Sequence, residues 1–233
     1  MADIAIDSGS PALASNGDVS SVSTASFTRP AGGLLVAMVF AISNATYTLA
    51  GGSLTWTRQV SGGADIWTAP VTGSGSMTVT VGNLVSGGFV GRGAAIKVIG
   101  LTGQSLLDSI GATGEGESTT NNLTAIGYTS TVAGSRGFFA GREAAISGAP
   151  TSTDTGFAWS FSTTEAFPAT YRGLFSYKAS NTASPSSDVT FNADASGSGT
   201  ADWEWVALEI VPDVNVRSRT VTSRAAVHRA ASW

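Results

Sequence analysis

Residues 34–42 read Leu-Leu-Val-Ala-Met-Val-Phe-Ala-Ile, and this stretch decides the predicted fold. Its larger apolar side chains occupy the even positions, and the smaller ones occupy the odd positions between them. A period of two is that of a β-strand, and a strand that is apolar on both faces lies in the middle of a sheet. Residues 94–99, with Lys97 as their one polar residue, and residues 203–211 show the same double apolar character. We therefore expect three central strands, whose outer faces a loop or a neighbouring subunit must cover.

Strands with one polar face surround these three. Apolar residues alternate with Thr, Ser or Gln in several further stretches, and pairs of Gly separate them, as the turns between strands require. About ten to twelve strands fit this pattern. The sequence predicts an all-β fold, a single antiparallel two-sheet β-sandwich of jelly-roll-like topology over residues 1–211, followed by an extended C-terminal arm over residues 212–233. Residues 111–122 are rich in Gly, Ser and Thr, and we expect a long loop or a domain seam there, with a single domain favoured.

The composition excludes several classes of chemistry. Charged residues make up 12% of the chain, about half the usual quarter. Cysteine is absent, which removes disulfides, Cys-ligated zinc and thiol nucleophiles. The one histidine, His228, lies in the terminal segment, where it suits neither a metal site nor a Ser-His-Asp triad. We expect no catalytic residues, no metal ion and no cofactor.

Membrane and nucleic-acid partners are not expected. Residues 1–7 lack the positive and apolar regions of a signal peptide. The apolar stretch 34–42 has about half the length that a membrane-spanning helix needs. The net charge of −4 argues against a general nucleic-acid binder, which would show a basic field.

The charge is divided unevenly along the chain. Residues 1–211 carry 8 Lys and Arg against 15 Asp and Glu, a net charge of −7, whereas residues 212–233 have a net charge of +3. This arm has too few apolar groups to order itself alone. We predict that it docks on an acidic partner; a loosely solvated tail is the alternative. The candidate partner-binding residues of the arm are Arg217, Arg219, Arg224, Arg229 and Trp233.

The acidic residues make poor catalytic pairs. Glu204 and Glu209 are five residues apart in one strand and therefore point to opposite faces. Glu115 and Glu117 share a face if extended, but solvated loop charges explain them; a glycosidase with other partners stays an alternative. Residues 192–198 resemble the first half of a calcium loop, yet the twelfth position is Trp203 instead of the required Glu. A turn rich in Asn, Asp and Gly accounts for that segment without metal.

Aromatic residues offer a further hypothesis. Trp56 and Trp159 alternate in phase with other apolar residues and are expected to fill the core. Trp203 and Trp205 lie opposite the face of Val206 and Leu208, so they are candidates for a subunit interface or for a flat platform under sugar rings. Trp67, Tyr171 and other aromatic residues could supply further platforms.

Five segments together resemble β-sandwich accessory proteins of tailed bacteriophages, of the minor tail or head-decoration type. They are residues 27–37 (Phe-Thr-Arg-Pro-Ala-Gly-Gly-Leu-Leu-Val-Ala), 54–58 (Leu-Thr-Trp-Thr-Arg), 65–70 (Asp-Ile-Trp-Thr-Ala-Pro), 77–81 (Met-Thr-Val-Thr-Val) and 94–98 (Ala-Ala-Ile-Lys-Val), and the closing 205–210 (Trp-Val-Ala-Leu-Glu-Ile) adds to the likeness. The resemblance implies a virion component that is added to the head or tail surface, often as an oligomer. It carries no site motif.

The expectation is a non-enzymatic structural protein of the virion, a minor tail protein exposed on the particle surface and anchored by its arm. Its partners would be other virion proteins and further copies of itself in a homo-oligomer. A head-decoration protein and a carbohydrate-binding module that recognises a host-surface glycan are the alternatives.

Overall fold

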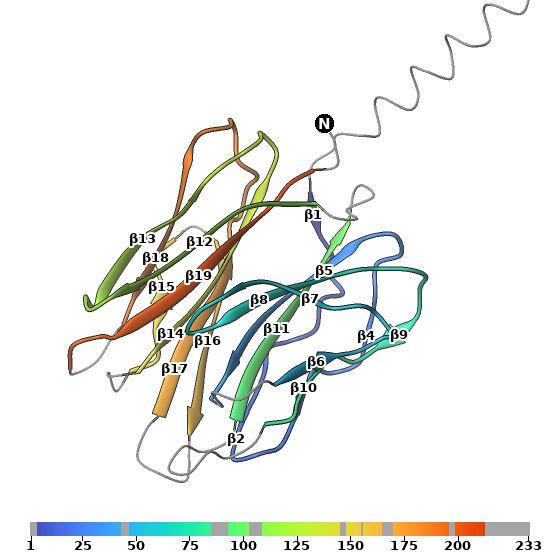
Figure 1. Cartoon of the computed structure of the whole chain (residues 1–233), viewed down its shortest axis with the longest axis horizontal. Helices are drawn as coiled ribbons and strands as arrows, with labels where there is room; N and C mark the ends of the chain where they lie inside the picture. Colours follow the sequence, from blue (N-terminus) through green and yellow to red (C-terminus); the bar gives the residue numbers. More distant parts are fainter. Residues whose placement is uncertain are drawn as a thin grey trace, which may run out of the picture.

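The computed structural model describes residues 4–42, 47–84, 93–102, 109–144, 148–154, 156–164, 170–195 and 199–212 (Figure 1). Within these ranges the regular elements are nineteen β-strands, β1 to β19, and every strand pair is antiparallel. The all-β antiparallel sandwich predicted from the sequence is confirmed.

The first half of the chain forms a large sheet with the strand order β1-β11-β5-β8-β7, and β2 also pairs with β11. Two of the three strands predicted to be apolar on both faces, β5 and β11, are neighbours in its middle and pair along eight residue positions. The bounds are β1 (Ala5–Ile6), β2 (Ala14–Gly17), β5 (Leu34–Ala41), β7 (Thr57–Ser61), β8 (Asp65–Pro70) and β11 (Gly93–Thr102).

Short strands of the same half cover one face of this sheet. Three of them form the sheet β3-β10-β6, and two more form the pair β4-β9. Their apolar residues join the odd-numbered residues of β5 in one buried cluster. The bounds are β3 (Val22–Ser23), β4 (Phe27–Thr28), β6 (Thr48–Ala50), β9 (Ser76–Met77) and β10 (Thr80–Gly82).

The second half repeats this plan. A large sheet has the order β12-β19-β14-β17-β16, and a smaller sheet has the order β13-β18-β15. A second buried cluster joins these two sheets. The bounds are β12 (Ile110–Ser118), β13 (Asn122–Thr129), β14 (Arg136–Glu143), β15 (Thr151–Ser152), β16 (Phe157–Thr164), β17 (Thr170–Tyr177), β18 (Asp188–Asp194) and β19 (Trp203–Ile210).

The two large sheets lie side by side (Figure 1). They pack against each other through a third cluster, to which both halves contribute. It joins the even-numbered residues of β5 to residues of β14, β17 and β19, and its largest members include Phe40, Phe138 and Phe175. The molecule therefore has four layers, with each large sheet apolar on both faces and a small sheet on either outside.

The alternation in the sequence explains which residue enters which cluster. In β5, Leu34, Val36 and Met38 face the central cluster, whereas Leu35 and Ala37 face the small sheet of the first half. In β19, the face of Val206, Leu208 and Ile210 meets the central cluster, and the face of Trp203, Trp205 and Ala207 meets the small sheet of the second half. The outer faces of these strands are covered by the chain itself, where a loop or a second subunit was expected.

Three details differ from the sequence prediction. The described residues form nineteen strands where about ten to twelve were expected, because several of the covering strands are only two or three residues long. The strands belong to five sheets instead of two, because one chain of this length builds a covering sheet on each side of the central pair. Residues 111–122 were expected to form a loop, but 110–118 form β12, which pairs along β19. Small residues are needed in this strand. Gly114 lies against the backbone of Gly127 and Gly116 lies against the ring of Trp205, and a Cβ at either position would collide with that neighbour.

The arm predicted over residues 212–233 lies outside the described residues from 213 onward. Its boundary with the 1–211 sandwich therefore stays a prediction. In the described part, Val211 still donates a hydrogen bond to the Ser109 carbonyl at 2.9 Å, and Pro212 is buried. No helix among the described residues is long and apolar enough to cross a membrane.

Candidate functional site

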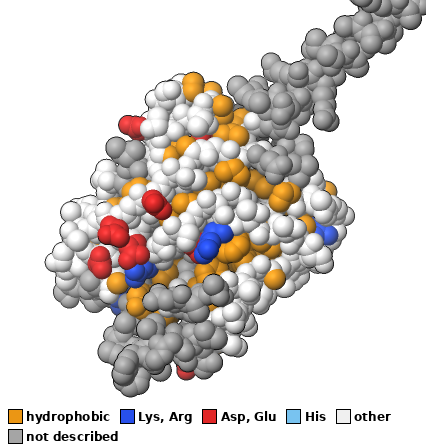
Figure 2. All heavy atoms as spheres, in the orientation of Figure 1, with side chains coloured by type: hydrophobic (Ala, Val, Ile, Leu, Met, Phe, Trp, Pro, Cys, Tyr) orange, Lys and Arg blue, Asp and Glu red, His pale blue; other side chains and the backbone are white. Residues whose placement is uncertain are grey.

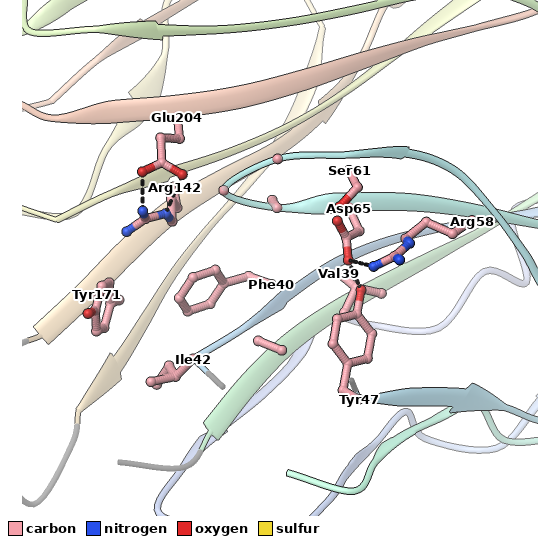
Figure 3. Close-up of a pocket in the computed structure, with 14 residues that line it drawn as sticks. Val39, Phe40, Ile42, Tyr47, Arg58, Ser61, Asp65, Arg142, Tyr171 and Glu204 are labelled. Carbon is pink, nitrogen blue, oxygen red and sulfur yellow. Dashed lines mark hydrogen bonds and ion pairs between the residues drawn. The ribbon is translucent and has the colours of Figure 1, made fainter. Parts of the chain in front are cut away.

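A polar cleft of about 380 Å³ lies at the junction of the two halves (Figure 3). The first half contributes the end of β5 and the hairpin β7–β8, and the second half contributes one residue each from β14, β17 and β19. The residues whose side chains give it its polar and aromatic character are Phe40, Tyr47, Arg58, Ser61, Asp65, Arg142, Tyr171 and Glu204.

The tip of the β7–β8 hairpin forms one wall of the cleft and touches the second half. It turns at Gly62 and Gly63, where the Gly62 N–H donates to the Ala64 carbonyl at 2.9 Å. A Cβ built on Gly62 would lie 2.9 Å from Val206 Cγ1, and one on Gly63 would lie 2.7 Å from Arg142 Nε. Side chains at the tip would push the halves apart, so glycine is needed here for the close approach of backbone to β19.

An Arg–Glu ion pair stands on one side of the cleft. Arg142 of β14 lies directly opposite Glu204 of β19 in the strand register. The guanidinium binds both carboxylate oxygens, with Nε to Oε2 at 3.2 Å and the second bond from Nη2 to Oε1. Its Cζ also lies 5.8 Å from the ring centroid of Tyr171, within the range of a cation–π contact. A two-bond pair of this kind fixes the planes of both side chains.

A second network stands on the opposite side, with Phe40 between the two (Figure 3). Tyr47 donates its hydroxyl hydrogen to Asp65, and Trp67 Nε1 donates to the Tyr47 oxygen at 2.9 Å. Arg58 reaches Asp65 from the solvent side at 3.5 Å. Burial, followed by the negative charge of Asp65, raises the pKa of Tyr47 above its usual value. Tyr47 therefore stays protonated and keeps its hydroxyl directed at the carboxylate.

A more open groove of about 510 Å³ adjoins the cleft on the other side of the hairpin tip. It is lined by the tip glycines, Glu115, Glu117, Glu204 and Trp205. Figure 2 shows acidic side chains gathered on this face beside a basic group. Glu115 and Glu117 are exposed and share one face of β12, as the sequence predicted for an extended segment, although that segment is a strand and not a loop.

The predicted separation of Glu204 and Glu209 is confirmed. Glu204 faces the cleft, whereas Glu209 is buried on the other face of β19. The Glu209 carboxylate accepts hydrogen bonds from the Ala112 N–H at 2.9 Å, and from the N–H and hydroxyl of Thr131 at 2.9 and 2.8 Å. Burial by itself would raise the pKa of Glu209, but these hydrogen bonds outweigh it and lower the pKa below its usual value. Glu209 fixes the segment that follows β13 and is not part of the cleft.

The two tryptophans predicted as an interface or glycan platform are in the interior. Trp203 is 0% exposed and Trp205 is 8% exposed. Both pack under the small sheet of the second half, where Trp205 stacks on Phe139. A flat platform needs a ring face open to solvent, so the structure corrects the platform assignment: β13 and β18 cover this face of β19. Trp159 packs against the central cluster and Trp56 against that of the first half, but both are only partly buried, so they border the core instead of filling it as expected.

The remaining predicted sites are settled only in part. Arg217, Arg219, Arg224, Arg229 and Trp233 lie outside the described residues. In the calcium-like segment 192–198, the Asn192 N–H and side-chain amide donate to Asp154 at 2.8 and 3.0 Å, and residues 196–198 are not described. Among the described residues, no group of three or more His, Asp or Glu side chains could hold a metal ion.

The sequence did not single out the residues that form the cleft, except Tyr171 and Glu204. Asp65 stands alone among apolar neighbours in the sequence, and Arg142 lies beside Glu143 between two apolar stretches. A charged residue inside an apolar strand was the available signal, because such a charge is kept only where it has a partner. The partner could not be identified, since Arg142 and Glu204 are 62 positions apart.

No family model, curated protein or solved structure matches this chain.

Proposed function

We propose that this protein is a non-enzymatic structural component of a tailed-phage virion, of the minor tail type, exposed on the particle surface and anchored by its C-terminal arm. The charge contrast carries this proposal: an acidic body of net charge −7 is followed by a basic segment of net charge +3. Such a segment suits the acidic surface of a neighbouring subunit, either another virion protein or a second copy of this chain.

The architecture supports a scaffold. Four sheet layers share three buried apolar clusters, and charged residues are few. The ionisable groups described above are used within the fold: Arg142 holds Glu204, Arg58 holds Asp65, and Glu209 accepts three hydrogen bonds from one loop and one strand. These contacts stabilise the sandwich and leave the loops as the surface for attachment.

The experiment is a truncation after Pro212. Because Val211 and Pro212 still contact the sandwich, removal of residues 213–233 cuts the chain beyond the last described contact. We expect the truncated protein to keep its circular dichroism and melting temperature but to be missing from purified particles. A full-length variant with Gln at 217, 219, 224 and 229 tests the charge alone and should be incorporated weakly. Normal incorporation of the truncated protein would overturn the anchoring role of the arm.

The copy number separates the two virion locations. A minor tail protein is present in few copies per particle, whereas a head-decoration protein is present in hundreds. Quantitative mass spectrometry of particles against the major capsid protein distinguishes them. Absence of the full-length protein from purified particles would overturn the proposal altogether.

A further inference from the structure

We propose that the cleft at the junction of the two halves binds a neutral saccharide unit. This inference goes beyond the structural role and does not depend on it, because it rests on the cleft alone. It replaces the buried Trp203 and Trp205 as the candidate carbohydrate site.

The size and position of the cleft suit a small polar ligand. Its volume of about 380 Å³ lies within the range of about 300–1,000 Å³ that is usual for small-molecule sites. It lies between two structural units that share one core, which is a frequent place for binding sites. The two ion-paired networks hold its polar groups in place, so little conformational entropy is lost when a ligand binds.

Both networks keep unused hydrogen-bonding capacity. A guanidinium has five N–H donors, and Arg142 directs only two of its nitrogens at Glu204. A carboxylate can accept about four hydrogen bonds, which leaves Glu204 and Asp65 able to accept more. Sugar hydroxyls are donors and acceptors at once, so neighbouring hydroxyls of one ring can bind a guanidinium and a carboxylate together. An ion pair in which both partners are fixed offers this combination.

The charge of the site favours a neutral ligand. Among the described residues that line the cleft, Arg58 and Arg142 balance Asp65 and Glu204. An anion would meet these two carboxylates and, across the hairpin tip, those of Glu115 and Glu117. A cation would meet two guanidinium groups. A ligand with many hydroxyls and no net charge avoids both repulsions.

Aromatic side chains supply the apolar part of the site. Tyr171 and Tyr47 are partly exposed and lie at opposite ends of the cleft (Figure 3), and Phe40 packs against Tyr171 at a centroid distance of 5.7 Å. The C–H face of a pyranose ring packs well on such rings, whose other end can stay in contact with water. The cleft therefore combines the two kinds of contact that sugar recognition uses.

The test is titration of the full-length protein with defined probes, followed by isothermal calorimetry and by saturation-transfer NMR. The neutral probes are tetrasaccharides of glucose, galactose, mannose and N-acetylglucosamine, each with its monosaccharide. The charged probes are a uronic-acid tetrasaccharide and a tetra-arginine peptide. We expect at least one neutral tetrasaccharide to bind and both charged probes to fail. Binding of the monosaccharide as well would indicate a free sugar, and binding of the tetrasaccharide alone would indicate a unit within a polysaccharide.

Two variants locate the binding. Ser61 is exposed at the rim, so Ser61→Trp should fill the cleft without disturbing the core and should weaken binding by about tenfold or more. Glu204→Gln keeps the shape of the side chain but removes its negative charge, and it should also weaken saccharide binding. The matched control is Asp154→Asn, which disrupts the Lys178–Asp154 ion pair outside the cleft and should leave binding unchanged. Circular dichroism confirms folding of each variant.

Three results would overturn the proposal. They are the failure of every neutral probe, tight binding of a charged probe in place of a neutral one, and neutral-sugar binding that folded Ser61→Trp and Glu204→Gln proteins retain in full.

Discussion

The ammonium group of Lys97 lies 4.3 Å from the centre of the Trp159 ring, and this contact joins the two halves of the molecule. Lys97 belongs to β11 of the first half and Trp159 to β16 of the second. Lys97 is 4% exposed, and its Nζ also donates to the Pro11 carbonyl. Lys97, the one polar residue of segment 94–99, is thus stabilised by an aromatic face and a carbonyl oxygen.

We predict that Lys97 makes stability rise with pH between about 8 and 10.5. Burial lowers the pKa of Lys97 from 10.5 to about 8, so in this window the unfolded chain binds a proton that the folded chain has released. The free energy of unfolding should increase by on the order of 3 kcal/mol over the whole window, since each pKa unit is worth about 1.4 kcal/mol. Urea unfolding at a series of pH values measures it. Lys97→Met should remove this slope, and a slope that stays unchanged would contradict the assignment.

Glu209→Gln should destabilise the second half at neutral pH by about 2–3 kcal/mol, because an uncharged amide accepts the hydrogen bonds of Ala112 and Thr131 less well. The folded-state pKa of Glu209 is lowered, so its contribution is complete above the unfolded-state value and is lost as pH falls through the folded-state value. The difference in the free energy of unfolding between the wild-type protein and Glu209→Gln should therefore shrink below about pH 4.5. Exposed Glu117→Gln is the control and should have little effect at either pH.

Gly63→Ala should destabilise the protein by about 1–3 kcal/mol, as expected for an added methyl group in a tight contact. The new Cβ would lie 2.7 Å from Arg142 Nε and against the side chain of Glu204, so the hairpin tip must move away from β19. Gly9→Ala is the matched control, because its Cβ would meet only Asp7 at an ordinary 3.4 Å. Thermal unfolding of both variants checks the difference. If Gly63→Ala and Gly9→Ala had equal melting temperatures, the hairpin tip would not be in tight contact with the second half.

Trp203→Ala should lower the free energy of unfolding by about 3–5 kcal/mol, the usual loss for a large buried aromatic residue. Phe157, which is 58% exposed and stacks on Tyr177, gives the contrast: Phe157→Ala should cost less than about 1 kcal/mol. Chemical denaturation measures both. A small effect of Trp203→Ala would mean that β13 and β18 do not cover this side chain as described.

Much of the fold could be predicted because strand alternation is a local property. Large and small apolar residues in 34–42 indicated a central strand with two packed faces, and the structure places one set in each of two clusters. The same reasoning separated the Val206 face of β19 from the Trp203 face, and Glu204 from Glu209. Each assignment needed only the period of two.

The site could not be predicted in the same way, because its residues meet through strand pairing between distant segments. Arg142 meets Glu204 only in the register of β14 and β19, and Asp65 meets Tyr47 only where the β7–β8 hairpin folds back. Alternation assigns a residue to a face of its strand, but the order of strands and the packing of sheets determine what that face contacts. The sequence by itself therefore determined the central strands and their two faces. Tertiary structure decided that Trp203 and Trp205 are covered and that two ion pairs border one cleft, because burial and pairing depend on segments far apart in the chain.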